Sequence, residues 1–296
     1  MNSIKSAILP IAFIIGAIFH TWMDSLTFLS PYLIFAMLFI TYCKLELKEF
    51  RLGRFQWVLL AVQMTLAAFF YFILLPAGHT VAEGVFICVF IPTATAAPVI
   101  TSMLGGDISR VATFSLLCNI FVAVTGPVVL AAVGDHSDYT FLHSLGLIMA
   151  RVLPLLILPI VCAIAVTRFA PRLHRFLVRR QSLSFYLWAV ALIIIVGSCV
   201  SFVINHWSAD SSRDMAFLAI GALGVCLIQF KVGRMVGSRF GDTVAGGQSL
   251  GQKNTVLAVW LALAYMNPIA SVAPAAYIAW QNIINSYEIM HHKSKD

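Results

Sequence analysis

Apolar segments long enough to cross a membrane follow one another along almost the whole chain, and they restrict its fold more than any other feature. A helix needs about 20 apolar residues to span the hydrocarbon core of a bilayer. The sequence is 60% hydrophobic and only 10% charged, whereas soluble domains have roughly 45–50% and 25%, so a soluble fold is excluded. We predict an all-α polytopic membrane protein with ten transmembrane helices, at residues 7–22, 29–43, 55–75, 81–104, 108–133, 151–169, 184–204, 215–230, 243–266 and 268–289.

Lysine and arginine gather in the loops on one side of this predicted bundle. All of the 19 basic residues lie there except Arg151, Arg213 and Lys253, whereas the opposite loops carry acidic residues that include Glu83. Cytoplasmic loops are enriched in Lys and Arg. We therefore predict an integral, multi-pass protein of the bacterial inner (plasma) membrane with both termini in the cytoplasm. The net charge of +7 then reflects orientation and needs no nucleic acid partner. A short interfacial helix is predicted at 44–54.

Ten helices divide into two halves of five, residues 1–139 and 140–296. A unit with an odd number of helices that is repeated once must enter the membrane from the opposite side, so the halves are predicted to be inverted repeats. Glycine, proline and polar residues interrupt the fourth segment, 81–104, and the ninth, 243–266, which hold the same position in each half. This pairing is typical of secondary transporters that bind substrate near the bilayer midplane.

Both interruptions contain side chains able to bind a ligand. Residues 92–98 read Pro-Thr-Ala-Thr-Ala-Ala-Pro, and residues 246–258 contain three glycines and Lys253. N-termini of half-helices attract anions, and a lysine at membrane depth is a functional candidate by default. The candidates for substrate binding are Thr93, Thr95, Pro98, Thr101, Asn119, Gln252, Asn254 and Thr255, and those for a cation site or for coupling are Lys253, Gln63 and Ser249.

Each of these features also has a structural explanation. Small and hydroxyl residues commonly serve close packing in membrane helices, and the charge of Lys253 could offset the C-terminal ends of the crossing half-helices. Both roles stay open. The six cysteines fall one per apolar segment, so neither a disulfide nor a metal site is predicted. The chain lacks a phosphate-cradling loop, a nucleophile elbow and paired intramembrane carboxylates, so we predict no enzyme and no catalytic residue.

The stretches 92–107 and 251–258 resemble the bile acid:sodium symporter family. The resemblance implies ten helices, a panel and a core domain, and a crossing of the fourth and ninth helices. The family's fourth-helix pattern, Pro-Gly-Gly-Thr-Ala-Ser-Asn, falls on residues 92–98. The Ser and Asn that help to hold sodium in the family are here Ala97 and Pro98, whose side chains offer no oxygen.

The ninth-helix pattern of the family, Glu-Thr-Gly-Met-Gln-Asn, falls on residues 249–254. The family's Glu is here Ser249, and the Gln that binds the second sodium ion is Lys253, while Gln63 resembles another ligand of that site. These differences remove oxygen ligands and introduce a fixed ammonium. Our hypothesis is that Lys253 takes the place of a sodium ion. A lysine that exchanges its proton during the cycle would give proton coupling, whereas a permanently charged one would favour facilitated diffusion or exchange.

The function that we predict is secondary active transport of a small organic anion, of the carboxylate or sulfonate type, by alternating access. The expected partners are this anion and the lipid bilayer, with no obligatory protein partner. No cofactor is expected, although sodium ions or protons could drive transport. One alternative is a sodium-coupled symporter of an organic anion or bile acid. Another, of a different class, is a non-transporting membrane receptor or sensor built on a transporter scaffold.

Overall fold

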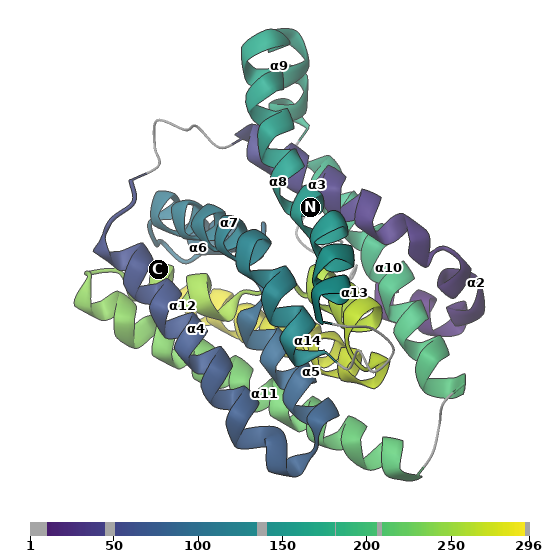
Figure 1. The fold of residues 1–296 in the computed structure, drawn as a ribbon. Coiled ribbons are helices and arrows are strands. Elements are labelled where there is room, and N and C mark those ends of the chain that lie inside the picture. Colours follow the sequence, from purple (N-terminus) through teal and green to yellow (C-terminus); the bar gives the residue numbers. More distant parts are fainter. Residues whose placement is uncertain (1–10, 45–50, 135–140, 181, 206–208, 294–296) are drawn as a thin grey trace.

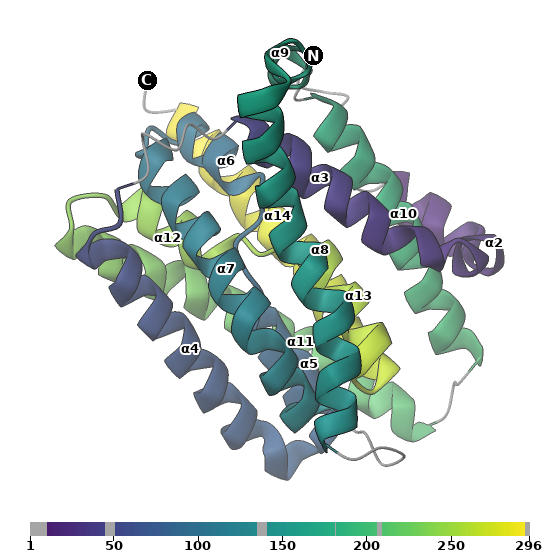
Figure 2. The ribbon, with the colours of Figure 1, turned by 45° about the horizontal axis from the view of Figure 1, so that its top comes forward.

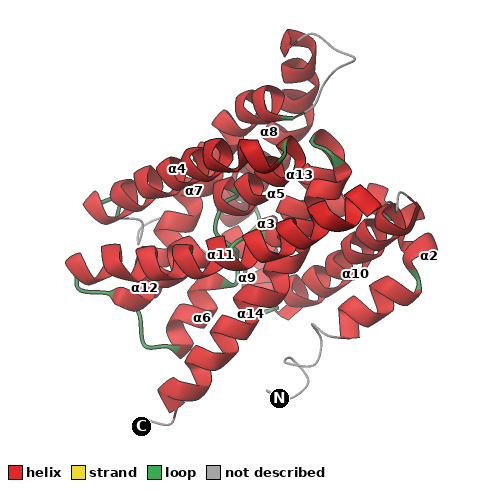
Figure 3. Ribbon diagram, turned by 90° about the horizontal axis from the view of Figure 1, so that it is seen from below, coloured by secondary structure: helices red, strands yellow, loops and turns green. Residues whose placement is uncertain are grey.

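Helices form the regular secondary structure of this computed structural model, which describes residues 11–44, 51–134, 141–180, 182–205 and 209–293 (Figures 1 and 3). Residues 11–18 are helical. The elements that follow are α2 (His20–Ser25), η1 (Thr27–Leu29), α3 (Ser30–Lys44), α4 (Arg54–Leu74), η3 (Leu75–Ala77), α5 (His79–Phe90), α6 (Ala97–Met103), α7 (Ile108–Val133), α8 (Phe141–Phe169), α9 (Pro171–Arg179), α10 (Ser182–Asn205), α11 (Ala209–Arg239), α12 (Thr243–Gly251), α13 (Thr255–Tyr265), η4 (Pro268–Ser271) and α14 (Val272–Lys293). The prediction of an all-α fold is confirmed.

The helices have the length and surface of a membrane protein. Six stretches are long and apolar enough to cross a bilayer, namely Thr27–Lys44, Arg54–Ala77, Ile108–Val133, Phe141–Phe169, Tyr186–Asn205 and Ser212–Arg239. The apolar helices α5 and α13 are shorter, with 12 and 11 residues. Large apolar side chains such as Trp22, Phe72 and Phe169 are exposed, which is unfavourable in water and favourable in hydrocarbon.

Two apolar segments are interrupted near their middle. The helix α5 ends at Phe90, and α6 begins at Ala97 with Pro98 in its first turn. Proline is tolerated there because its missing N–H would have no partner in the helix. The second interruption separates α12 from α13 and contains only residues 252–254. It is therefore shorter than the stretch 246–258 in which the glycines were expected to unwind the helix.

The glycines of α12 serve close packing rather than unwinding. Gly233 and Gly237 of α11 face Gly246 of α12, and a Cβ atom added to Gly246 would overlap backbone atoms of both. A Cβ atom added to Gly233 would in turn overlap the backbone of Gly246. Glycine at a helix interface lets two backbones approach closely, so these residues fix the distance between α11 and α12.

Two aspartates begin helices and join them. The Asp107 carboxylate accepts hydrogen bonds from the N–H groups of Ser109 (2.9 Å) and Arg110 (3.2 Å) at the start of α7. The Asp242 carboxylate accepts from the N–H of Ala245 (2.8 Å) in α12 and from the N–H of Asp107 (2.8 Å). An aspartate at this position satisfies N–H groups that have no partner within the helix, and the bond to Asp107 ties the two helix starts together.

Glu83 is buried within a helix, which corrects its assignment to a loop. The helix α5 begins at His79, two residues before the expected start at residue 81, and Glu83 lies in its second turn and is fully buried. The interfacial helix predicted at 44–54 includes residues 45–50, which lie outside the described residues. The helix α4 begins at Arg54.

The helices pack in two groups (Figure 2). In the first group, α10 packs against α2 and α3, and α3 packs against α8 and α9. In the second group, α11 packs against α5, α12 and α14, α5 packs against α4, and α7 packs against α6 and α12. The groups meet where α13 and η4 contact α10, where α13 contacts α3, and where α7 contacts α8. Both interruptions belong to the second group.

Candidate functional site

The two interruptions cross and bond to each other through their backbones. Thr93 and Lys253 form an isolated antiparallel bridge. The N–H of Ala94 donates to the carbonyl of Gln252 (2.9 Å), and the N–H of Asn254 donates to the carbonyl of Pro92 (2.9 Å). Unwound backbone at membrane depth needs such partners because lipid offers none. The crossing therefore brings the ends of four short helices to one place.

Lys253 is buried at this crossing, with only 1% of its surface exposed. Its Nζ atom donates to the carbonyl oxygens of Val89 (2.9 Å) and Ile91 (3.2 Å) at the end of α5. The C-terminal end of a helix carries a partial negative charge, so the ammonium lies where it is favoured. Within the described residues, no carboxylate forms an ion pair with it. These contacts therefore fit the structural role considered above, in which the charge of Lys253 offsets the C-terminal end of a half-helix.

Gln63 binds the same helix end from α4. Its Nε2 atom donates to the carbonyls of Phe90 (2.9 Å) and Ile91 (3.1 Å), and it lies 3.3 Å from the sulfur of Cys118. Gln63 is fully buried, and it faces the crossing as predicted. Lys253 and Gln63 therefore share the carbonyl of Ile91. Donors that are part of the chain therefore occupy the carbonyl oxygens at this helix end.

Two further candidates are linked to Thr93, Ser249 directly and Asn119 through Ser115. The Thr93 hydroxyl donates to the carbonyl of Ser249 (2.6 Å). The hydroxyl of Ser115 donates to the carbonyl of Thr93 (3.3 Å), and the Nδ2 atom of Asn119 donates to the carbonyl of Ser115 (2.7 Å). Ser249 Oγ and Asn119 Oδ1 are buried and have no hydrogen-bond partner among the described residues. They are buried polar atoms of this site that the described residues leave unsatisfied.

The other candidates are placed differently. Thr101 is buried and donates to the carbonyl of Ala97 (2.8 Å) in its own helix, which is a local role. Asn254 begins α13 by accepting from the N–H of Leu257 (3.3 Å). Gln252 points toward α14, where its Oε1 atom accepts from Asn285. Partly buried Thr95 and Pro98 lie at the start of α6, and buried Thr255 is the first residue of α13.

Sequence reasoning missed a polar stripe on α14, formed by Tyr277, Gln281, Asn285 and Glu288. The Tyr277 hydroxyl donates to the carbonyl of Gly251 (2.8 Å). The side chain of Gln281 accepts from the N–H of Lys253 (2.9 Å) and donates to its carbonyl (3.3 Å). The spacing of four, four and three residues puts this stripe on one helix face. That spacing within an apolar segment is the signal that could have revealed it.

Replacing Tyr277 with phenylalanine is expected to destabilise the protein. The change leaves the buried carbonyl of Gly251 and the Nε2 atom of Gln229, which lies 3.0 Å from the tyrosine oxygen, without this partner. An unsatisfied buried group costs about 1–3 kcal/mol. Thermal unfolding of the purified protein measures the effect, and Tyr287→Phe, at a tyrosine exposed on the same helix, is the control. Equal midpoints for the two variants would contradict the prediction.

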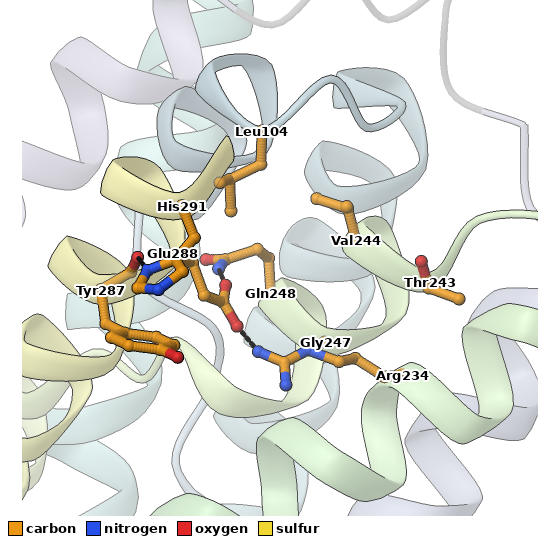
Figure 4. Close-up of a pocket in the computed structure, with 9 residues that line it drawn as sticks. All are labelled: Leu104, Arg234, Thr243, Val244, Gly247, Gln248, Tyr287, Glu288 and His291. Carbon is orange, nitrogen blue, oxygen red and sulfur yellow. Dashed lines mark hydrogen bonds and ion pairs between the residues drawn. The ribbon is translucent and has the colours of Figure 1, made fainter. Parts of the chain in front are cut away.

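A pocket of about 370 Å³ lies at one end of the second helix group (Figure 4). Its lining comes from α6, α11, α12 and α14, with Leu104, Arg234, Thr243, Val244, Gly247, Gln248, Tyr287, Glu288 and His291. Arg234 forms an ion pair with Glu288, and Gln248 donates to Glu288 (3.3 Å) and to Asn285 (2.9 Å). None of the predicted site residues lines this pocket, so it is separate from the crossing.

The fold and the crossing together define an all-helical membrane protein with two interrupted helices joined at a buried lysine. Six described helices have the length and composition to span a membrane. No protein-family model matches the chain, and no curated protein matches it significantly.

Proposed function

We propose that this chain is a secondary active transporter of a small organic anion that works by alternating access. The observation that carries the proposal is the backbone bridge between Thr93 and Lys253, where two interrupted helices cross. Crossing interrupted helices form the substrate sites of several transporter families, because half-helix ends there concentrate partial charges of both signs. The hydroxyl of Ser249, which has no hydrogen-bond partner among the described residues, would donate a hydrogen bond to the anion.

The transmembrane arrangement that we propose has ten helices in two inverted halves, residues 1–139 and 140–296. In this arrangement, the described segments α5 with α6 form the fourth helix and α12 with α13 form the ninth. The two helix groups would correspond to a panel and a core that move against each other. Both termini would be cytoplasmic in a bacterial inner membrane, in agreement with the distribution of the 19 lysines and arginines.

We further propose that the chain is a divergent relative of the bile acid:sodium symporters in which Lys253 replaces a sodium ion. The contacts of its Nζ atom with the carbonyls of Val89 and Ile91 support this view, because carbonyl oxygens are ligands of small cations. Gln63, which resembles a sodium ligand of that family, binds the same helix end. Transport would then be independent of sodium, and proton coupling or exchange would drive it.

Uptake by proteoliposomes tests the function. A panel of labelled carboxylates and sulfonates is offered under an imposed sodium gradient and, separately, under an imposed proton gradient. We expect uptake that is indifferent to sodium and driven by the pH gradient. Uptake driven by sodium would overturn the replacement of sodium by Lys253. Binding of a panel anion without flux would favour the receptor alternative.

The second candidate function is sodium-coupled symport of an organic anion or bile acid. The observation that favours it is the pair of buried side-chain oxygens, Ser249 Oγ and Asn119 Oδ1, which have no hydrogen-bond partner among the described residues. Oxygen atoms of this kind are suitable ligands for a monovalent cation. A sodium dependence of uptake that disappears in Ser249→Ala and Asn119→Leu would support this candidate.

A further inference from the structure

Glu83 is a fully buried carboxylate in the first half of an interrupted helix, away from the crossing. Burying a charge in an apolar environment is costly unless partners compensate it. Within a membrane-spanning segment, an ionisable side chain points to a functional site. The surroundings of Glu83 therefore indicate what it could do.

A short network connects Glu83 to the protein surface. The Oε1 atom of Glu83 lies 3.4 Å from Nδ1 of His79, one helical turn earlier, and Nε2 of His79 lies 3.2 Å from the Tyr71 hydroxyl. The side chain of His79 is 50% exposed while that of Glu83 is 0% exposed. The imidazole thus has one side in contact with the exterior and the other in contact with the buried carboxylate.

The Glu83 carboxylate also binds the start of η4, an element that contacts the first helix group. Glu83 Oε2 accepts a hydrogen bond from the N–H of Asn267 (3.2 Å). Asn267 begins η4, since its side chain accepts from the N–H of Ile269 (3.0 Å). The element η4 packs against α10. A change of charge on the neighbouring His79 would therefore act, through the Glu83 carboxylate and η4, on a contact between the two helix groups.

Few other described titratable groups lie near the start of α5 on the elements packed against it. The helix α4 contributes Tyr71, the outer end of α11 contributes Arg213 and Asp214, α13 contributes Tyr265, and α14 contributes Tyr277 in its buried part. The elements η3 and η4 have no titratable side chain. Histidine is the residue whose charge ordinarily changes between about pH 5 and about pH 8, and His79 is the histidine in contact with the Glu83 carboxylate.

We propose that His79 and Glu83 bind, as a pair, the proton that is coupled to transport. A proton from water adds to the imidazole, so that the pair changes from a net charge of minus one to an imidazolium–carboxylate pair of net charge zero. No other bond forms or breaks. His79 Nδ1 and Glu83 Oε1 lie 3.4 Å apart, so the proton is held between the two groups. The proposal rests on the proposed transport function, and it places the proton on this pair rather than on Lys253.

Proton binding by the purified protein, measured without any substrate, tests the proposal. Proton uptake is recorded as the pH is lowered from about 8 to about 5, the range in which histidine titrates. We expect the Glu83→Gln uptake curve to differ from that of the wild type, because the carboxylate that lies 3.4 Å from the imidazole is removed. The double variant His79→Gln/Glu83→Gln should take up about one proton fewer than the wild type.

Glu288→Gln is the control, because Glu288 is a carboxylate that is largely buried, like Glu83, but pairs with Arg234. Its uptake curve should superimpose on that of the wild type. The proposal is wrong if the Glu83→Gln curve also superimposes, or if the double variant binds as many protons as the wild type. The purified protein could bind the proton as expected while no anion of the panel is taken up under a pH gradient. That result would reject the transport function and leave this proton site in place.

Discussion

Replacing Lys253 with glutamine is expected to make the thermal stability of the protein depend on sodium. The substitution removes the ammonium from the carbonyls of Val89 and Ile91 and adds an amide oxygen beside them. Together these oxygens form a set that a monovalent cation can bind. At a sodium concentration ten times the dissociation constant, binding would stabilise the variant by about 1.4 kcal/mol and raise its unfolding midpoint by about 3–6 °C.

The measurement compares unfolding midpoints in sodium chloride and in choline chloride at equal ionic strength. The wild type should show no difference specific to sodium, because Lys253 already occupies the carbonyl oxygens. Lys253→Met is the control, since it removes the charge without adding an oxygen, and it should show none either. A sodium effect of equal size in the wild type would contradict the idea that the lysine replaces an ion.

Replacing Gly246 with valine is expected to have the largest effect on folding. Any Cβ atom at this position overlaps backbone atoms of Gly233 and Gly237. Backbone cannot move aside as a flexible side chain can, so α11 and α12 would have to separate. We expect a loss of about 3 kcal/mol or more in the free energy of unfolding, in the upper range for overpacking. Thermal unfolding and the yield of monodisperse protein report this loss.

Gly224→Ala is the matched control for this experiment. Gly224 lies in the same helix, α11, but an added Cβ atom meets no atom within 4 Å. Alanine in a helix is more favourable than glycine by roughly 0.5–1 kcal/mol, so this variant should be as stable as the wild type or slightly more so. If Gly246→Val were tolerated as well as Gly224→Ala, the close approach of the two helices would not be essential.

The positions of the helices could be predicted from the sequence because hydrophobicity and helix-breaking residues act locally. The predicted segment 108–133 coincides with α7, and both interruptions fall within the predicted segments. The role of Gly246 could not be predicted, because the residues that give it a packing role, Gly233 and Gly237, belong to another helix. Glycine lowers helix stability in isolation, but close packing against a neighbour outweighs this effect.

The sequence singled out polar residues at the crossing, but not the residues that surround them. Lys253 and Gln63 were identified because polar side chains are rare in apolar segments. The carbonyl partners of Lys253 depend on where α5 ends. The hydrogen bond between the Gln281 side chain and the backbone of Lys253 depends on which face of α14 meets the interruption. Glu83 was counted among the loop residues by its charge, yet it lies in the second turn of α5 and is fully buried. Such contacts depend on tertiary packing rather than on local sequence.

The backbone bridge at the crossing also has a consequence for biosynthesis. The carbonyl of Pro92 and the N–H of Ala94 find their partners at Asn254 and Gln252, which the ribosome adds only after more than half of the chain has followed. Until then, the first interruption is unwound without these partners, and lipid cannot supply them. A nascent chain that stops before residue 252 would therefore retain exposed backbone N–H and carbonyl groups at the first interruption. A membrane quality-control protease could recognise them.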